Sequence, residues 1–331
     1  MTLSSSLKQS IFNWMVLYFL LLLHPSVASN GDNSNQFQGC FHTCHFNNCS
    51  EERNLKNFYI NQNIFNKLLF WSCEDECKYE CMWHTTNAYL NKGWEIPQFF
   101  GKWPFKRFLG LQEPASVAFS VMNFLSHCYN FKNFRKSVPP NAPFYYLWHL
   151  YFLISLNAWF WSVCFHARDT SFTEKLDYFS AFSMVLSTFL MLLLRASGKL
   201  QTTRKILIAV GALLFYLYHI WYLSRNFDYD YNMKVNVIVG LLNGFGWLFW
   251  SWKRPDKRGY LFWCHATNVC LGMTLVFELL DFSPILWTFD AHSLWHLSTV
   301  ILPFFWYRFI EGDCYYLLEN MSRRSYLKKS A

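Results

Sequence analysis

Three histidines stand at the ends of apolar runs in this chain. His292 and His296, four residues apart, open the last apolar run in the sequence DAHSLWH, and His166 closes an earlier one in WSVCFH. Three neutral imidazoles with one open position form the usual protein ligand set of a catalytic zinc ion. We therefore treat His166, His292 and His296 as candidate zinc ligands. The question is which elements bring them together.

Two further polar residues accompany these histidines. Ser162 precedes His166 by four residues, which puts both on one face of a helix, and Asp177 opens the next apolar run. At a zinc site, Asp177 could accept the proton of the attacking water and return it to the leaving group, while Ser162 could orient that water or stabilise an oxyanion. The five residues together predict a metal-dependent hydrolase.

Each of these residues also has a simpler interpretation. A single histidine at a helix end is commonly an interfacial polar residue. Ser162 could bond a carbonyl of its own helix, and Asp177 could be a charge that favours a helix N-terminus. Asp290 is interpreted as the N-cap of the last span, with a contact to a ligand histidine as the alternative. Other polar residues are left without a catalytic role: Asp228, Asp230, Glu278 and Asp281, interpreted as solvated or interhelical, and His149, His219 and His265, interpreted as structural.

The composition sets the environment of these residues. Of the 331 residues, 53% are hydrophobic, 21% aromatic and only 15% charged, which is too apolar for an ordinary soluble domain. We expect an all-α membrane protein with a bundle of seven transmembrane helices over residues 113–310. The expected spans are 113–131, 144–166, 176–194, 204–223, 232–251, 259–280 and 292–310.

Basic residues predict the orientation of the spans. Sixteen of them lie in the first, third and fifth connections and at the C-terminal end, against four in the other connections and the adjoining helix ends. The side rich in Lys and Arg is cytoplasmic in membrane proteins. The formal charge of +8 is thus explained by topology and gives no support to nucleic-acid binding. This orientation places all five candidate site residues in one layer near the lumenal ends of three helices.

The N-terminal part predicts export. Residues 1–28 have the pattern of a signal peptide, with an uncleaved anchor as the alternative. Residues 29–112 then form a cysteine-rich lumenal segment in which three disulfides are expected, with open connectivity, and a zinc site is the less favoured alternative. Asn48 begins the glycosylation sequon Asn48-Cys49-Ser50. The disulfide candidates are Cys40, Cys44, Cys49, Cys73, Cys77 and Cys81.

An aromatic and basic stretch at 101–108 precedes the first span. Such a composition is typical of the membrane interface. We expect it to anchor the chain at the membrane surface, and contact with a phospholipid headgroup is the alternative.

The same residues carry a resemblance to a known family. Ser162-x3-His166, Asp177 and His292-x3-His296 across seven spans resemble the CREST superfamily of membrane hydrolases. Longer strings, such as GKWPFKRFLGLQEPASVAFS at 101–120 and DFSPILWTFDAHSLWH at 281–296, are similar to its Per1-like family and to the GPI-specific phospholipase A2-like group within it. The resemblance covers nearly everything after residue 39.

The resemblance implies a specific activity. A member of this group would remove the sn-2 fatty acid from the lipid of GPI-anchored proteins, with Zn²⁺ bound by His166, His292 and His296 and with Ser162 and Asp177 assisting the water. The tail 311–331 ends in Lys328-Lys329-Ser330-Ala331, which looks like a dilysine retrieval signal read by coat proteins. That signal suits a multi-pass protein that cycles between Golgi and endoplasmic reticulum. A plain polar tail is the alternative.

Two other functions compete with the esterase. A ceramidase-type amidase would use the same chemistry, but it would not need a cysteine-rich lumenal segment to meet a protein substrate. A receptor or noncatalytic escort for GPI-anchored cargo would keep zinc as a structural ion.

Overall fold

A computed structural model describes residues 31–198, 201–254 and 259–329, with the backbone alone for 278–279 and 324–329. The expected signal peptide and the last two residues lie outside this range. The described residues are nearly all helical, with two isolated β-bridges and no longer strand among them. The helices are α2 (Asn35–Cys49), α3 (Glu52–Asn61), α4 (Ile64–Leu68), α5 (Cys73–Asn91), α6 (Pro114–Ser137), α7 (Tyr145–Ala167), α8 (Ser171–Ala196), α9 (Thr202–Arg225), α10 (Tyr229–Trp252), α11 (Leu261–Leu279), α12 (Ala291–Thr299) and α13 (Leu302–Lys329).

The chain divides into two compact units. The first consists of Met1–Gly110 and Val276–His292, and the second of Leu111–Leu275 and Ser293–Ala331. The boundary between them crosses α12 after its first two residues. Each unit is described by itself below.

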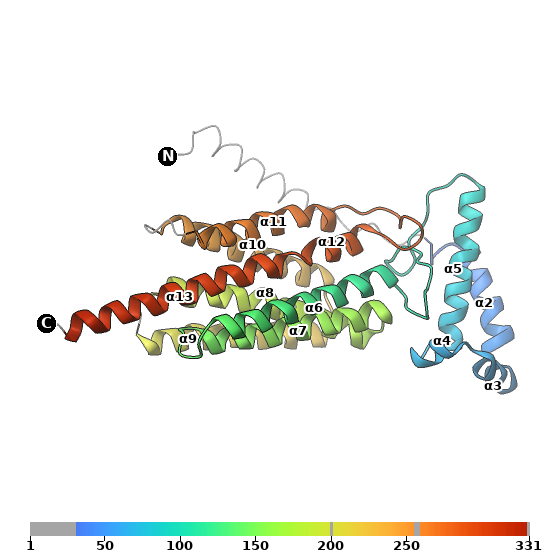
Figure 1. Cartoon of the computed structure of the whole chain (residues 1–331). Helices are drawn as coiled ribbons and strands as arrows, with labels where there is room; N and C mark the ends of the chain where they lie inside the picture. Colours follow the sequence, from blue (N-terminus) through green and yellow to red (C-terminus); the bar gives the residue numbers. More distant parts are fainter. Residues whose placement is uncertain (1–30, 199–200, 255–258, 330–331) are drawn as a thin grey trace. The chain divides into compact units, whose positions relative to one another are not determined.

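Disulfides hold the first unit together. Helices α2 and α5 lie side by side (Figure 1) and are joined by three bridges, which confirms the expectation of a disulfide-rich N-terminal segment. The cysteines repeat at about one helical turn on each helix, so an antiparallel pair matches them in nested order. Only a small core, centred on Phe37, Cys81 and Phe99, accompanies the bridges, as expected for a disulfide-stabilised small domain. The bridges are Cys40–Cys81, Cys44–Cys77 and Cys49–Cys73.

The segment 276–292 completes the first unit. The carboxylate of Asp281 accepts hydrogen bonds from the Gln98 amide at 3.0 Å and from the Trp103 indole at 2.6 Å. The Lys106 backbone N–H donates to the Trp287 carbonyl at 2.9 Å. Asp281, for which the sequence suggested no role, therefore binds the end of the cysteine-rich segment to this later part of the chain.

The second unit is a helical bundle (Figure 1). Helix α7 packs between α6 and α8, α8 also packs on α9 and α10, and α13 packs on α6. Its core is rich in aromatic residues, with Phe134, Trp247 and Tyr307 almost inaccessible. This bundle positions the candidate site.

Four helices of the bundle are long and apolar enough to cross a membrane, namely α7, α8, α9 and α10. Large apolar side chains on the outside of α9 are exposed, with Leu207 and Leu214 each more than half accessible. An outward apolar surface of this kind is suited to lipid. The all-α membrane fold is confirmed, whereas a total of seven spans stays a prediction.

The helix ends follow local sequence rules. Pro114 opens α6, and Thr170 and Thr173 form a capping box at the start of α8. The Asp228 carboxylate caps α10 by accepting a bond from the Tyr231 N–H at 2.9 Å. Asp230 forms an exposed ion pair with Lys234. Asp290 directly precedes α12, at the position where the sequence predicted an N-cap.

The last expected span is not one continuous helix. Helix α12 ends at Thr299 and α13 begins at Leu302, so the two residues between them interrupt the helix. Pro303 explains the interruption, because proline has no N–H to donate to the carbonyl four residues earlier and its ring clashes with that turn. The candidate ligands His292 and His296 consequently lie on a helix of nine residues.

A buried ion pair crosses the bundle at another point. The Arg195 guanidinium donates from Nε and Nη2 to the two carboxylate oxygens of Asp313, at 2.6 and 2.7 Å. The Tyr260 hydroxyl donates to the same carboxylate at 3.3 Å. Helices α8 and α13 are thus connected by a bidentate, charge-assisted contact.

Candidate metal centre

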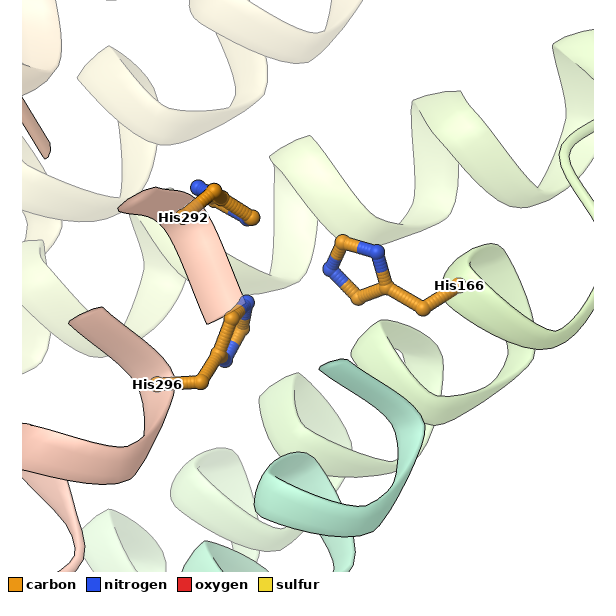
Figure 2. A group of neighbouring side chains, drawn as sticks. All are labelled: His166, His292 and His296. Atoms are coloured by element: carbon orange, nitrogen blue, oxygen red, sulfur yellow. The ribbon is translucent and has the colours of Figure 1, made fainter. Parts of the chain in front are cut away.

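The structure brings the three candidate histidines together. His166 lies in the last turn of α7, whereas His292 and His296 lie one turn apart on α12 (Figure 2). One ring nitrogen from each lies within 4.8 Å of the others. The rings of His166 and His296 meet edge to face with their centroids 4.9 Å apart. The expected convergence of His166, His292 and His296 is therefore present in the structure.

The local sequence explains why these side chains converge. Residues four apart on a helix share one face, so His292 and His296 point in similar directions from α12. His166 and His296 are 2% and 3% exposed, and His292 is half-buried. The group is therefore largely shielded from solvent, and His292 is its partly accessible member.

A buried carboxylate contacts the first of these histidines. Glu113 Oε2 lies 2.7 Å from Nδ1 of His166, and Glu113 is only 5% exposed. Its position is fixed by the backbone, since the Glu113 N–H donates to the His166 carbonyl and the Gln112 N–H donates to the Ala167 carbonyl, both at 3.0 Å. A carboxylate at Nδ1 favours the tautomer with the proton there and leaves Nε2 as a ligand atom.

Two serines lie beside the histidines. The Ser120 and Ser162 hydroxyl oxygens are 3.0 Å apart, and Ser120 Oγ is also 3.4 Å from Nδ1 of His296. Both serines are buried. Ser120 of α6 thus connects Ser162 to the histidine group. The Ser162 hydroxyl therefore has a partner outside its own helix.

The chain is similar to known proteins over most of its length. The sequence profile of the Per1-like family matches residues 63–314. The chain belongs to the Per1-like family. It is similar to "Post-GPI attachment to proteins factor 3" of Drosophila melanogaster, with 41% identity over 90% of this chain and 93% of that protein. It is also similar to "GPI-specific phospholipase A2-like PGAP3" of Mus musculus (42%; 91% and 95%) and of Homo sapiens (39%; 91% and 95%). No solved structure matches.

Polar side chains of α6 hold the broken helix of this Per1-like chain. The Asn123 amide donates to the His296 carbonyl at 2.7 Å, and the Ser126 hydroxyl donates to the Val300 carbonyl at 2.9 Å. The Thr299 hydroxyl bonds the Asn123 side-chain oxygen at 3.3 Å. These bonds satisfy backbone groups next to the interruption before Pro303. Helix α6 therefore fixes the element that carries two of the three candidate ligands.

Asp177 is not a member of the close histidine group. It is half-buried on α8 and lies near enough to Cys164 of α7 to interact with it electrostatically. Cys164 itself stands between Ser162 and His166 in the sequence. The role of Asp177 as a proton acceptor stays a prediction.

The other histidines that were interpreted as structural lie in different surroundings. His149 contacts the Tyr145 carbonyl at 2.9 Å, and His219 packs against Phe182 with ring centroids 4.2 Å apart. His265 lies 3.2 Å from the Ser251 hydroxyl. None of these three belongs to the histidine group among the described residues.

The sequence interpretation missed three members of this environment, namely Glu113, Ser120 and Asn123. All three lie in the first expected span, 113–131, and were treated only as parts of it. A signal was present, because polar residues recur at helical spacing along α6, at positions 113, 116, 120, 123 and 127. Such a stripe in an apolar helix indicates a face that packs on polar partners.

Proposed function

We propose that this Per1-like chain is a zinc-dependent ester hydrolase that removes the sn-2 fatty acid from the phosphatidylinositol of GPI-anchored proteins. The observation that supports it best is the buried group of three histidines on α7 and α12, next to the Ser120–Ser162 pair. The substrate class is suggested by relatives named GPI-specific phospholipase A2-like. The apolar bundle suits a substrate whose acyl chains stay in the membrane.

The residues present fit a zinc ion. All three donors are imidazoles, a ligand type that zinc prefers in catalytic sites. Nitrogens within 4.8 Å of one another need only small side-chain rotations to share one ion. The Glu113 contact at Nδ1 of His166 is the kind of outer contact that zinc-binding histidines usually make.

The chain's own residues supply the remaining steps. Zinc, when bound, supplies a Lewis-acidic centre that makes water a better nucleophile at neutral pH. Glu113 holds the His166 ring in place. Ser162, oriented by Ser120, donates to the developing negative charge on the ester oxygen. Asp177 takes the proton of the attacking water and passes it to the leaving oxygen of the lipid.

The proposal includes the membrane topology. The cysteine-rich segment faces the lumen, where Asn48 is glycosylated, and the C-terminus faces the cytoplasm. Asn48 is exposed, as an acceptor of glycan must be. Residence in Golgi and endoplasmic reticulum depends on Lys328 and Lys329 through contact with coat proteins. Replacing both lysines by serine should move the protein out of these compartments, as microscopy of tagged chains would show.

The hydrolase is tested by lipid analysis of GPI anchors from cells in which this chain is the only source of the activity. The variants are His296→Ala and Asp177→Asn, with His42→Ala, an exposed histidine of the first unit, as the control. We expect retained sn-2 chains in the first two and normal anchors in the control. Normal anchors in the site variants, at normal abundance and location, would contradict the enzyme and favour an escort. Ceramide offered to the purified protein separates an amidase from an esterase.

A further inference from the structure

A cleft of about 410 Å³ in the first unit is lined almost entirely by side-chain amides. It is formed by the end of α2, by α3, by the turn into α4, by Asn66 of α4 and by one residue of α5. Its volume lies in the range of roughly 300–1,000 Å³ that small-ligand sites occupy. Six of the amides carry the argument: Asn47, Asn54, Asn57, Asn61, Gln62 and Asn66.

The lining carries almost no charge. Among the described residues that form the cleft, none is a lysine or an arginine, and Glu76 is the one ionisable group. Its carboxylate is already paired with Arg107 at 2.5 Å and accepts a bond from the Asn66 amide at 3.3 Å. Phosphates and other anions normally need cationic partners. The cleft therefore suits an uncharged polar ligand.

Several of the amides are fixed in place. The Asn54 amide nitrogen donates to the Asn47 carbonyl at 2.9 Å, and the Gln62 amide nitrogen donates to the Trp71 carbonyl at 2.6 Å. With the nitrogen used, each amide keeps a side-chain oxygen as an acceptor. Preorganised acceptors reduce the entropy lost when a ligand binds. The side chains of Asn54 and Gln62 are thus already held in place before a ligand binds.

Two exposed amides add donors to these acceptors. Asn57 and Asn61 lie one turn apart on α3, so they share one face of the helix. Each side chain can donate two hydrogen bonds and accept two. Phe58, half-buried in the same lining, supplies an apolar ring surface. Sugar hydroxyls donate and accept at once, and the C–H face of a sugar ring packs on aromatic rings.

We propose that this cleft is a binding site for a neutral carbohydrate. Under the proposed function, on which this source depends, the ligand is the glycan of a GPI-anchored substrate. The same chemistry has a second source, because Asn48 of the glycosylation sequon also lines the cleft. An N-glycan attached to Asn48 of the same chain could therefore occupy the cleft itself.

Binding is measured on the full chain in detergent micelles by saturation-transfer NMR. The probe is the neutral glycan of a GPI-anchored protein, prepared by removing its phosphates with aqueous hydrogen fluoride and deaminating its glucosamine. We expect the double variant Asn57→Ala/Asn61→Ala to bind it roughly ten-fold more weakly, because two neutral hydrogen bonds are lost. Phe58→Ala should weaken it as well. The control is Asn87→Ala/Asn91→Ala, two exposed amides of α5 outside the cleft.

The sequon variant Ser50→Ala distinguishes the two sources. If the probe binds both the wild type and Ser50→Ala, the cleft takes a substrate glycan. If it binds Ser50→Ala alone, the cleft takes carbohydrate but the resident N-glycan fills it. If it binds neither form, or binds the Asn57/Asn61 variant as well as the wild type, the site is excluded, provided that the three disulfides are intact by mass spectrometry.

This assay is independent of ester hydrolysis because its probe has no acyl chain. Glycan binding without sn-2 hydrolysis would contradict only the hydrolase. Hydrolysis without glycan binding would contradict only the cleft.

Discussion

Glu113 Oε2 lies 2.7 Å from Nδ1 of His166, and both side chains are buried. The carboxylate keeps the imidazole in one tautomer and one orientation. It thereby determines which nitrogen His166 presents to a metal.

Glu113→Gln should therefore lower zinc affinity by about 10- to 100-fold, the loss typical of an outer contact to a ligand histidine. An amide can still accept a bond from Nδ1–H, but it lacks the charge that makes the ring a stronger donor to the metal. The measurement is chelator competition on the purified protein. Glu95→Gln, an exposed glutamate of the first unit, serves as the control. Equal affinities in both variants would show that Glu113 has no part in metal binding.

Ser120→Ala should slow the reaction without removing the metal. The Ser162 hydroxyl would lose its partner at 3.0 Å, and with it a hydrogen bond of about 1 kcal/mol, which corresponds to roughly a five-fold change in rate. We expect kcat to fall, KM to change little and zinc content to stay at the wild-type value. Ser126→Ala, on the same helix but bonded to the Val300 carbonyl, is the matched comparison. A loss of zinc in Ser120→Ala would assign this serine to ligand binding instead.

Asn123→Leu should destabilise the bundle by about 1–3 kcal/mol, because its two hydrogen bonds to the His296 carbonyl and the Thr299 hydroxyl would be lost. These two groups would keep only the 2.8 Å bond to each other. Thermal unfolding of the protein in detergent measures the change. The exposed Val121→Leu on the same helix should have no comparable effect. An unchanged melting temperature for Asn123→Leu would mean that α12 is held by other contacts.

The Arg195–Asp313 pair should show strong coupling. Arg195→Met leaves the Asp313 carboxylate buried without its charged partner, a change that costs about 3–5 kcal/mol in comparable cases. Arg195→Met/Asp313→Leu should recover most of that loss, because no buried charge remains. A double-mutant cycle on unfolding free energies tests this. Additive single effects would contradict the direct contact.

The sequence was most informative for features that depend on the spacing of residues along one helix. Helical spacing placed His292 and His296 on one face, and topology placed His166 at the same depth. Six clustered cysteines behind an expected signal peptide predicted three bridges, although the nested pairing became visible only from the antiparallel contact of α2 with α5. Glu113 and Asp281 could not be assigned in this way, since their partners lie 53 and 183 or 178 residues away in the chain. Pro303 indicated a possible break in the last span. Because the apolar run 292–310 continues on both sides of this proline, one continuous span was expected.

The division of the histidines between α7 and α12 affects how the protein matures. A helix of nine residues is too short to be stable by itself. Helix α12 is synthesised late, and we expect it to become fixed only when side chains of α6 donate hydrogen bonds to the His296 and Val300 carbonyls and the three imidazoles have come together. A shared ion would then act as a cross-link between segments more than a hundred residues apart in the chain. If zinc binds there as proposed, its loading would be the closing step of assembly, and a chain truncated before α12 would lack two of the three histidines that this step needs.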